Sequence, residues 1–173
     1  MILTDIISDG LFAAVAAIGF GAISDPPMRA FPSIAALAAI GHALRFCLMT
    51  YLGVDIATAS LCASFSIGMG SVLLAKRIYC PMTVLYIPAL LPMIPGMYAY
   101  KTVFALIMFM QNLQSPELQH RYLQDLCTNG IVAGSVIFML AVGATMPLFL
   151  FKSRAFSMTR HEKKMPKSSS ATR

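Results

Sequence analysis

The chain of 173 residues is 58% hydrophobic and 12% charged, with a mean hydropathy of +0.74 and a formal net charge of +6. Soluble proteins average about 25% charged residues, so this composition excludes a soluble enzyme domain and indicates an integral membrane protein. Its basic residues gather mostly beside the last apolar run, which favours contact with membrane lipids over binding of nucleic acid.

The first predicted span covers residues 6–24 and ends before two consecutive prolines, which stop a helix. Ala13, Ala17 and Gly21 recur every four residues. Such a stripe of small side chains allows another helix to approach closely. Asp9 lies near the outer end of this run and is interpreted as an interfacial residue rather than a buried proton carrier.

The second predicted span covers residues 31–52 and contains the motif GHALR at 41–45. His42 and Arg45 are three residues apart, so they share one face of a helix. A charge at this depth costs about 2.5–3.5 kcal/mol and usually faces a pathway or a partner. His42 is also a candidate carrier of a coupling proton. The alternative is that Arg45 snorkels to the outer interface and His42 bonds a neighbouring carbonyl.

The third predicted span covers residues 55–75 and has Ser60, Ser64 and Gly68 on one face. This spacing of small residues predicts a helix–helix contact, with the lining of a polar path as the alternative.

The fourth predicted span, residues 84–109, is apolar but carries Pro88, Pro92, Pro95 and Gly96 close to its middle. Proline lacks an N–H and crowds the carbonyl four residues back, so a continuous helix is not expected. In hydrocarbon every freed backbone group needs a partner, and such a break therefore belongs inside a bundle or beside a watery cavity. Transporters build substrate sites from broken helices of this kind.

A helix that restarts after Gly96 would present the free N–H groups of residues 97–100, including those of Tyr98 and Tyr100, to an anion. Lys101 adds a full positive charge to that end. The alternative for the whole segment is a kinked helix that serves only for packing.

The polar residues 111–125 predict a short surface helix, and a fifth span follows at 126–151. Gly130 and Gly134 form a GxxxG packing pair at the start of this span. Asn129, near the outer end, is a candidate for substrate binding or for a bridge between helices.

Residues 152–173 form a basic, serine-rich tail that is predicted to be disordered at the cytoplasmic surface. With five spans, ten of the thirteen Lys and Arg residues fall on one side of the membrane and one on the other. Basic loops stay in the cytoplasm, so the N-terminus is expected outside and the C-terminus inside.

Taken together, three segments resemble the threonine/serine exporter family, and in particular its YjjB-type small membrane subunit. They are GHALR at 41–45, PMIPGMYAY at 92–100, and Thr128 with Asn129 followed by residues 143–147. The resemblance covers nearly all of the chain except the tail.

This resemblance implies a two-subunit exporter of small polar carboxylates in the bacterial inner membrane, with a YjjP-type membrane subunit as the partner. It implies succinate for the split branch of the family and serine or threonine for the fused members. Substrate-binding candidates come from the GHALR motif, the broken span and the start of the fifth span: His42, Arg45, Pro92, Pro95, Gly96, Tyr98, Tyr100, Lys101 and Asn129.

The cationic candidates have no mid-span carboxylate beside them to meet an ammonium group, which favours succinate over an amino acid. A second hypothesis is a structural subunit that only scaffolds its partner. An intramembrane enzyme is disfavoured because the sequence has no HExxH motif, no pair of mid-span aspartates and no Gly-rich phosphate loop. No metal-ligand spacing or cofactor motif is present, and the four cysteines form no CxxC pair.

Overall fold

The computed structural model describes residues 2–151, and nearly all of them are helical, which confirms the predicted all-α class. The tail predicted over 152–173 lies outside the described residues. The elements in chain order are α1 (Ile2–Ile23), η1 (Met28–Ala30), α2 (Phe31–Tyr51), α3 (Ile56–Ile78), α4 (Met82–Leu90), η2 (Leu91–Met93), α5 (Gly96–Gln111) and α6 (Pro116–Leu150).

Four of these helices, α1, α2, α3 and α6, are long and apolar enough to cross a membrane. A further pair, Met82–Met93 and Gly96–Gln111, meets the same criteria jointly but is bent by 58° at its break. If this pair is one span, the described chain has five, as the sequence predicts.

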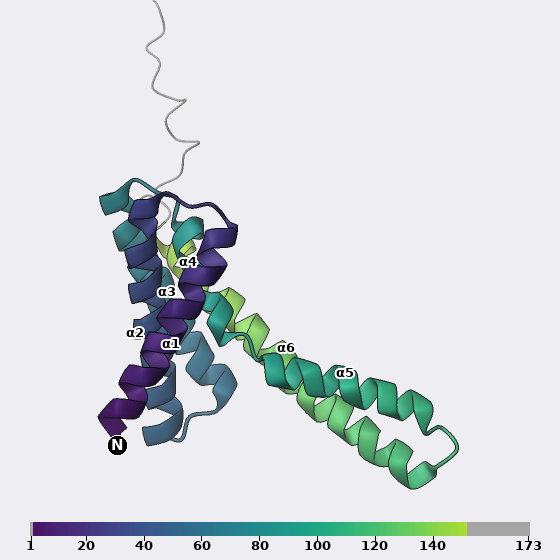
Figure 1. Cartoon of the computed structure of the whole chain (residues 1–173). Coiled ribbons are helices and arrows are strands. Elements are labelled where there is room, and N and C mark those ends of the chain that lie inside the picture. Colours follow the sequence, from purple (N-terminus) through teal and green to yellow (C-terminus); the bar gives the residue numbers. More distant parts are fainter. Residues whose placement is uncertain (1, 152–173) are drawn as a thin grey trace, which may run out of the picture.

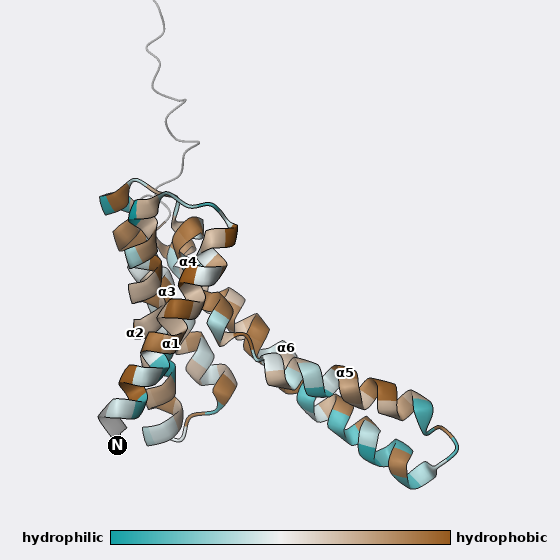
Figure 2. Ribbon diagram, viewed as in Figure 1, coloured by the Kyte–Doolittle hydropathy of each residue, from teal (hydrophilic) through white to brown (hydrophobic). Residues whose placement is uncertain are grey.

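The helices form an upright bundle and an arm that leaves it at an angle (Figure 1). Helices α1 to α4 stand in the bundle, and the second half of α6 packs against α3. Helix α5 and the first half of α6 run side by side along the arm. Hydrophobic residues cover much of the bundle and α5, whereas hydrophilic residues gather on the outer half of α6 (Figure 2).

The stripe of small residues on α1 is buried, as the sequence predicts. Ala13 and Ala17 are at most 4% exposed, and Gly21 is buried beside Ile34 of α2. The short side chains therefore bring α1 and α2 into direct contact.

The small face of α3 is a helix contact, as predicted. Ser60 and Ser64 are fully buried, and their hydroxyls donate to helix carbonyls. Ser64 also donates across the interface to the carbonyl of Met139 on α6, at 3.3 Å. A methyl group at Gly68 would lie 2.7 Å from the carbonyl oxygen of Ala144, so the two backbones approach closely here.

Two expectations for the last third of the described chain are wrong in detail. The surface helix of 111–125 and the span from 126 are one 35-residue helix, α6. Pro116 at its first turn starts the helix, and no further proline occurs in it before Pro147. In the GxxxG pair, Gly130 faces Thr102 of α5 at 3.5 Å, but Gly134 has nothing within 4 Å.

Gly143 of α6 also lies at a close approach of α3 and α6, and its importance for this contact can be tested. A methyl group there would meet Ser64 Oγ and lie 2.7 Å from the Leu61 carbonyl oxygen. Since that oxygen belongs to a helix backbone, we expect Gly143→Ala to lower the free energy of unfolding by about 1–3 kcal/mol. Unfolding in detergent micelles measures the change.

Gly134→Ala is the matched control, because it makes the same substitution in the same helix at an open position. It should leave stability unchanged or raise it by up to about 1 kcal/mol, the helix-propensity gain of alanine over glycine. Equal losses in the two variants would contradict this role of Gly143.

Candidate functional site

The break between α4 and α5 is partly buried. Pro88, Met93 and Pro95 are buried, whereas Ile94 and Gly96 are exposed. Helix α4 continues into the single turn η2, Ile94 is extended, and α5 begins at Gly96. In a continuous helix, the N–H groups of residues 92 and 95 would donate to the carbonyls four residues earlier. Proline has no N–H, so these carbonyls lose their helical donors.

Every carbonyl from Leu91 to Pro95 nevertheless has a nitrogen within hydrogen-bond distance. Three are satisfied within the segment: Leu91 by the N–H of Ile94, Ile94 by that of Gly96, and Pro95 by those of Tyr98 and Ala99. The remaining two, Pro92 and Met93, are reached by side chains of α2. The Leu91 carbonyl, which loses its helical donor because Pro95 has no N–H, is thus paired locally.

The two donors from α2 are His42 and Arg45 of the GHALR motif. Arg45 Nη1 donates to the Met93 carbonyl at 2.8 Å, and His42 Nε2 lies 3.4 Å from the Pro92 carbonyl oxygen. Both side chains are half-buried. Gly41 permits the approach, because a methyl group at this position would overlap Ile67 and lie 3.0 Å from Met93 Cε.

Asp9 of α1 completes this cluster, a contact that the sequence did not predict. Its Oδ2 lies 2.8 Å from His42 Nδ1, with 35% of the Asp9 side chain and 16% of the His42 side chain exposed. A signal was available. In the predicted topology, the start of the first span and the end of the second lie at the same side of the membrane, which brings Asp9 toward His42.

The cluster of Asp9, His42 and Arg45 with the carbonyls of Pro92 and Met93 is called the break cluster below. It combines one acidic side chain, one imidazole and one guanidinium around two main-chain acceptors. The sequence left open that His42 bonds a neighbouring carbonyl while Arg45 snorkels to the outer interface. His42 does contact a carbonyl, that of Pro92, but Arg45 turns inward to Met93.

The first turn of α5 offers fewer free N–H groups than the sequence predicts. Gly96 donates to Ile94, and both Tyr98 and Ala99 donate to Pro95. Tyr98 is half-buried, whereas Tyr100 is exposed and stacks on Phe104 with 6.3 Å between ring centroids. This helix end is therefore mostly occupied by its own backbone acceptors.

Lys101 and Asn129 lie together, but in the arm rather than in the break cluster. They line a pocket of about 280 Å³ between α5 and α6, with Phe104, Ala105, Tyr122 and Asp125. Lys101 is exposed, and Asn129 Nδ2 donates to the backbone carbonyl of Asp125 at 2.7 Å. The predicted site residues thus divide into two groups, one in the bundle and one in the arm.

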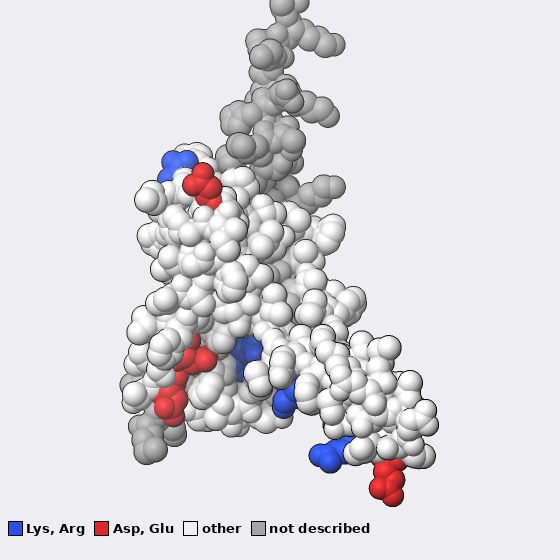
Figure 3. All heavy atoms as spheres, turned by 45° about the vertical axis from the view of Figure 1, so that its right-hand side comes forward, with Lys and Arg blue, Asp and Glu red and all other residues white. Residues whose placement is uncertain are grey.

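Figure 3 shows how charge is distributed over the described surface. Acidic and basic side chains gather toward two opposite ends, and the surface between them is almost free of charge. This is the distribution expected of helices that cross a lipid layer. In the lower half, basic side chains lie at the recess between the bundle and the arm (Figure 3).

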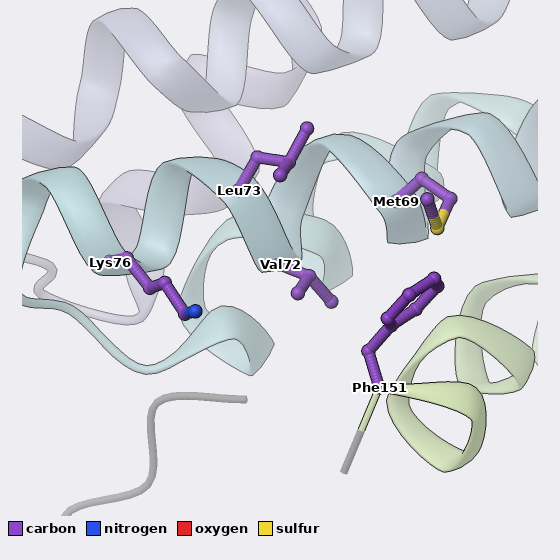
Figure 4. Close-up of a pocket in the computed structure, with 5 residues that line it drawn as sticks. All are labelled: Met69, Val72, Leu73, Lys76 and Phe151. Atoms are coloured by element: carbon purple, nitrogen blue, oxygen red, sulfur yellow. The ribbon is translucent and has the colours of Figure 1, made fainter. Parts of the chain in front are cut away.

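A second pocket, of about 290 Å³, lies between α3 and the end of α6. Figure 4 shows Met69, Val72, Leu73 and Lys76 along α3, with Phe151 opposite them. It contains none of the predicted substrate residues, and four of its five lining side chains are apolar. Among residues 2–151, no three His, Cys, Asp or Glu side chains lie close enough together to hold a metal ion.

Long apolar helices packed around a proline-broken span, with His42 and Arg45 bonded to that break, define the architecture of a multi-pass membrane protein. The family model described as Threonine/Serine exporter, ThrE, matches residues 9–150. The chain belongs to this family.

The chain is also similar to an uncharacterized protein of Haemophilus influenzae, with 31% identity over 134 residues. The match covers 78% of this chain but 45% of the relative, so the chain spans about half the length of that protein. No solved structure matches the chain.

The bond between Arg45 and Met93 is expected to stabilise the fold. Arg45→Met keeps much of the apolar stem but leaves the carbonyl of the buried Met93 without this donor, which costs about 1–3 kcal/mol. Lys101→Met, at an exposed position, should change stability by less than about 0.5 kcal/mol. Thermal unfolding in detergent compares the two variants, and equal stabilities would show that the bond contributes nothing.

Proposed function

We propose that this chain is one subunit of a two-subunit exporter of small carboxylates in the bacterial inner membrane. Membership in the threonine/serine exporter family supports export as the activity. The observation that carries the proposal is the hydrogen bond of Arg45 to the Met93 carbonyl. It places a permanent cation directly on the broken span, where a transporter of this design binds its substrate.

A YjjP-type membrane subunit is the proposed partner. The relative from Haemophilus influenzae is more than twice as long as the segment that it shares with this chain. A second chain would supply the counterpart of the remaining part of that relative. The partner would contact the partly exposed His42 and Arg45 at the break and the pocket between α5 and α6. The proposed orientation, N-terminus outside and C-terminus in the cytoplasm, follows from the distribution of basic residues.

Arg45 gives the proposal a mechanism. A guanidinium can form two parallel charge-assisted hydrogen bonds with a carboxylate, but only a single one is seen with the carbonyl here. A substrate carboxylate that reaches Arg45 therefore competes well with the Met93 carbonyl, which holds a single bond of 2.8 Å. Substrate binding would free this carbonyl and loosen the broken span from α2. Binding and opening are thereby joined at one side chain.

Succinate is the first proposed substrate. Arg45 offers a permanent cation at the break for one of the succinate carboxylates, whereas Lys101 lies apart in the arm. Serine or threonine is the second candidate, and Asp9 is the observation that favours it. With Asp9 close to Arg45 in one cluster, a zwitterion finds an acidic group for its ammonium and a basic group for its carboxylate.

Transport by vesicles tests the proposal. We expect export when this chain and its co-purifying membrane partner are reconstituted together, and none with either alone. Arg45→Gln should lower the export rate roughly tenfold or more, the effect of losing one charge-assisted hydrogen bond. Assembly with the partner, measured by co-purification, should not change.

Arg121→Gln is the control, because it removes an exposed cation of α6 that lies in neither site. Export by Arg45→Gln at the rate of the wild type, with normal assembly, would favour the scaffold hypothesis instead.

The ratio of two export rates separates the two substrates. Asp9→Asn removes the proposed partner of an ammonium group, so the serine-to-succinate ratio should fall roughly tenfold if amino acids are carried. The ratio cancels any effect on the opening step that both substrates share. An unchanged ratio would contradict a role for Asp9 in binding an amino acid.

A further inference from the structure

His42 lies between two oxygen atoms, one of the Asp9 carboxyl group and one of the Pro92 main-chain carbonyl. Its Nδ1 is 2.8 Å from Asp9 Oδ2, and its Nε2 is 3.4 Å from the carbonyl oxygen of Pro92. A carbonyl is always an acceptor, and an ionised carboxylate is one too. The ring therefore joins α1 to the broken span through α2.

Counting hydrogens shows what this geometry requires. A neutral imidazole has one N–H, so with ionised Asp9 only one of the two contacts can be a hydrogen bond. Both can form when the pair carries one more proton. That proton lies either on the ring, as imidazolium beside carboxylate, or on the acid, which then donates to Nδ1 while Nε2–H faces Pro92.

We propose that Asp9 and His42 form a binding site for one proton, and that this proton ties the broken span to α1 and α2. When it leaves, either the Asp9 contact or the Pro92 contact must be lost. The proton therefore controls the same break that substrate would loosen through Arg45. Only the role of this proton in transport rests on the proposed function; the proton site itself does not.

Few other charges act on the pair. On α1, Asp5 precedes Asp9 by one turn and is exposed. On α2, Arg45 follows His42 by one turn and is directed to Met93. The segment Met82–Met93 contains no Asp, Glu, His, Lys or Arg. On α3, which packs on α2, the charged residues lie at the ends: Asp55 before its first turn, and Lys76 and Arg77 in its last.

Arg45 and the pair also balance one another. Without the proton the pair carries one negative charge, which offsets that of Arg45. With the proton the pair is neutral, and the guanidinium charge is uncompensated. Proton uptake thus leaves the break more attractive to a carboxylate, and by linkage a bound carboxylate strengthens proton binding.

Hydrogen exchange at the break measures the tie directly. The reporters are the amides of Ile94, Gly96, Tyr98 and Ala99, which all bond within the break segment. We would follow them in the full-length chain with its co-purifying partner in lipid nanodiscs, without substrate, from about pH 5 to pH 8. After correction for intrinsic exchange, protection in the wild type should fall roughly tenfold as the pH rises, the loss of one hydrogen bond.

Asp9→Asn should abolish this pH dependence. The asparagine amide can donate to Nδ1 of a neutral ring while Nε2–H bonds Pro92, so both contacts form without an extra proton. Protection should stay high throughout. His42→Gln, which cannot reach both partners, should give low protection at every pH. His120→Gln, a matched change on the exposed part of α6, should keep the wild-type profile.

Protection in the wild type that does not vary with pH would overturn the proposal. So would an Asp9→Asn protein that keeps the wild-type pH dependence, even if His42→Gln fails to fold. Because no substrate is present, a failure of export leaves this result standing. Conversely, normal export through a break insensitive to pH would overturn the proton site alone.

Discussion

The need to satisfy main-chain carbonyls at a proline-rich break governs this protein. Prolines at 88, 92 and 95 remove the N–H groups that a continuous helix would offer. Within a membrane there is little water to replace them, and each unsatisfied group costs several kcal/mol. The segment repairs three of its five carbonyls by local turns and leaves two for α2. The polar side chains of His42 and Arg45 therefore lie at the break because its main-chain carbonyls require donors.

This constraint explains why one short motif does several things. Gly41 removes the side chain that would hold α2 away from Met93, and one turn of helix then brings His42 and Arg45 to adjacent carbonyls. The imidazole has a second nitrogen, which Asp9 uses to connect α1. The groups that satisfy the broken backbone thus form a site with an imidazole, a carboxylate and a guanidinium. In the proposals above, substrate displaces the bond of Arg45 to the break, and loss of a proton displaces that of His42.

The sequence predicts the elements that local physics determines. The all-α class, the break, the shared face of His42 and Arg45, and the buried serine face of α3 all follow from composition and spacing. The sequence did not predict features that depend on distant partners. Asp9 joined the cluster because α1 and α2 pack in one particular register, and Lys101 was separated from Arg45 because the break bends the span by 58°. The length of α6 was missed because a polar helix and an apolar one can be continuous.

The same helix decides how the arm and the bundle can move. From Gly130, which faces α5, α6 passes to Val136, which is fully buried in the core. Beyond this point Gly68 and Gly143 bring α3 and α6 so close that sliding meets backbone atoms. Gly134, between the two regions, has no neighbour within 4 Å, and glycine weakens a helix interior. The second connection between the arm and the bundle is the segment 94–96, which follows the two carbonyls that α2 contacts. Any movement of the arm would therefore have to bend α6 and the main chain beside the break cluster, because these are the two connections between the arm and the bundle.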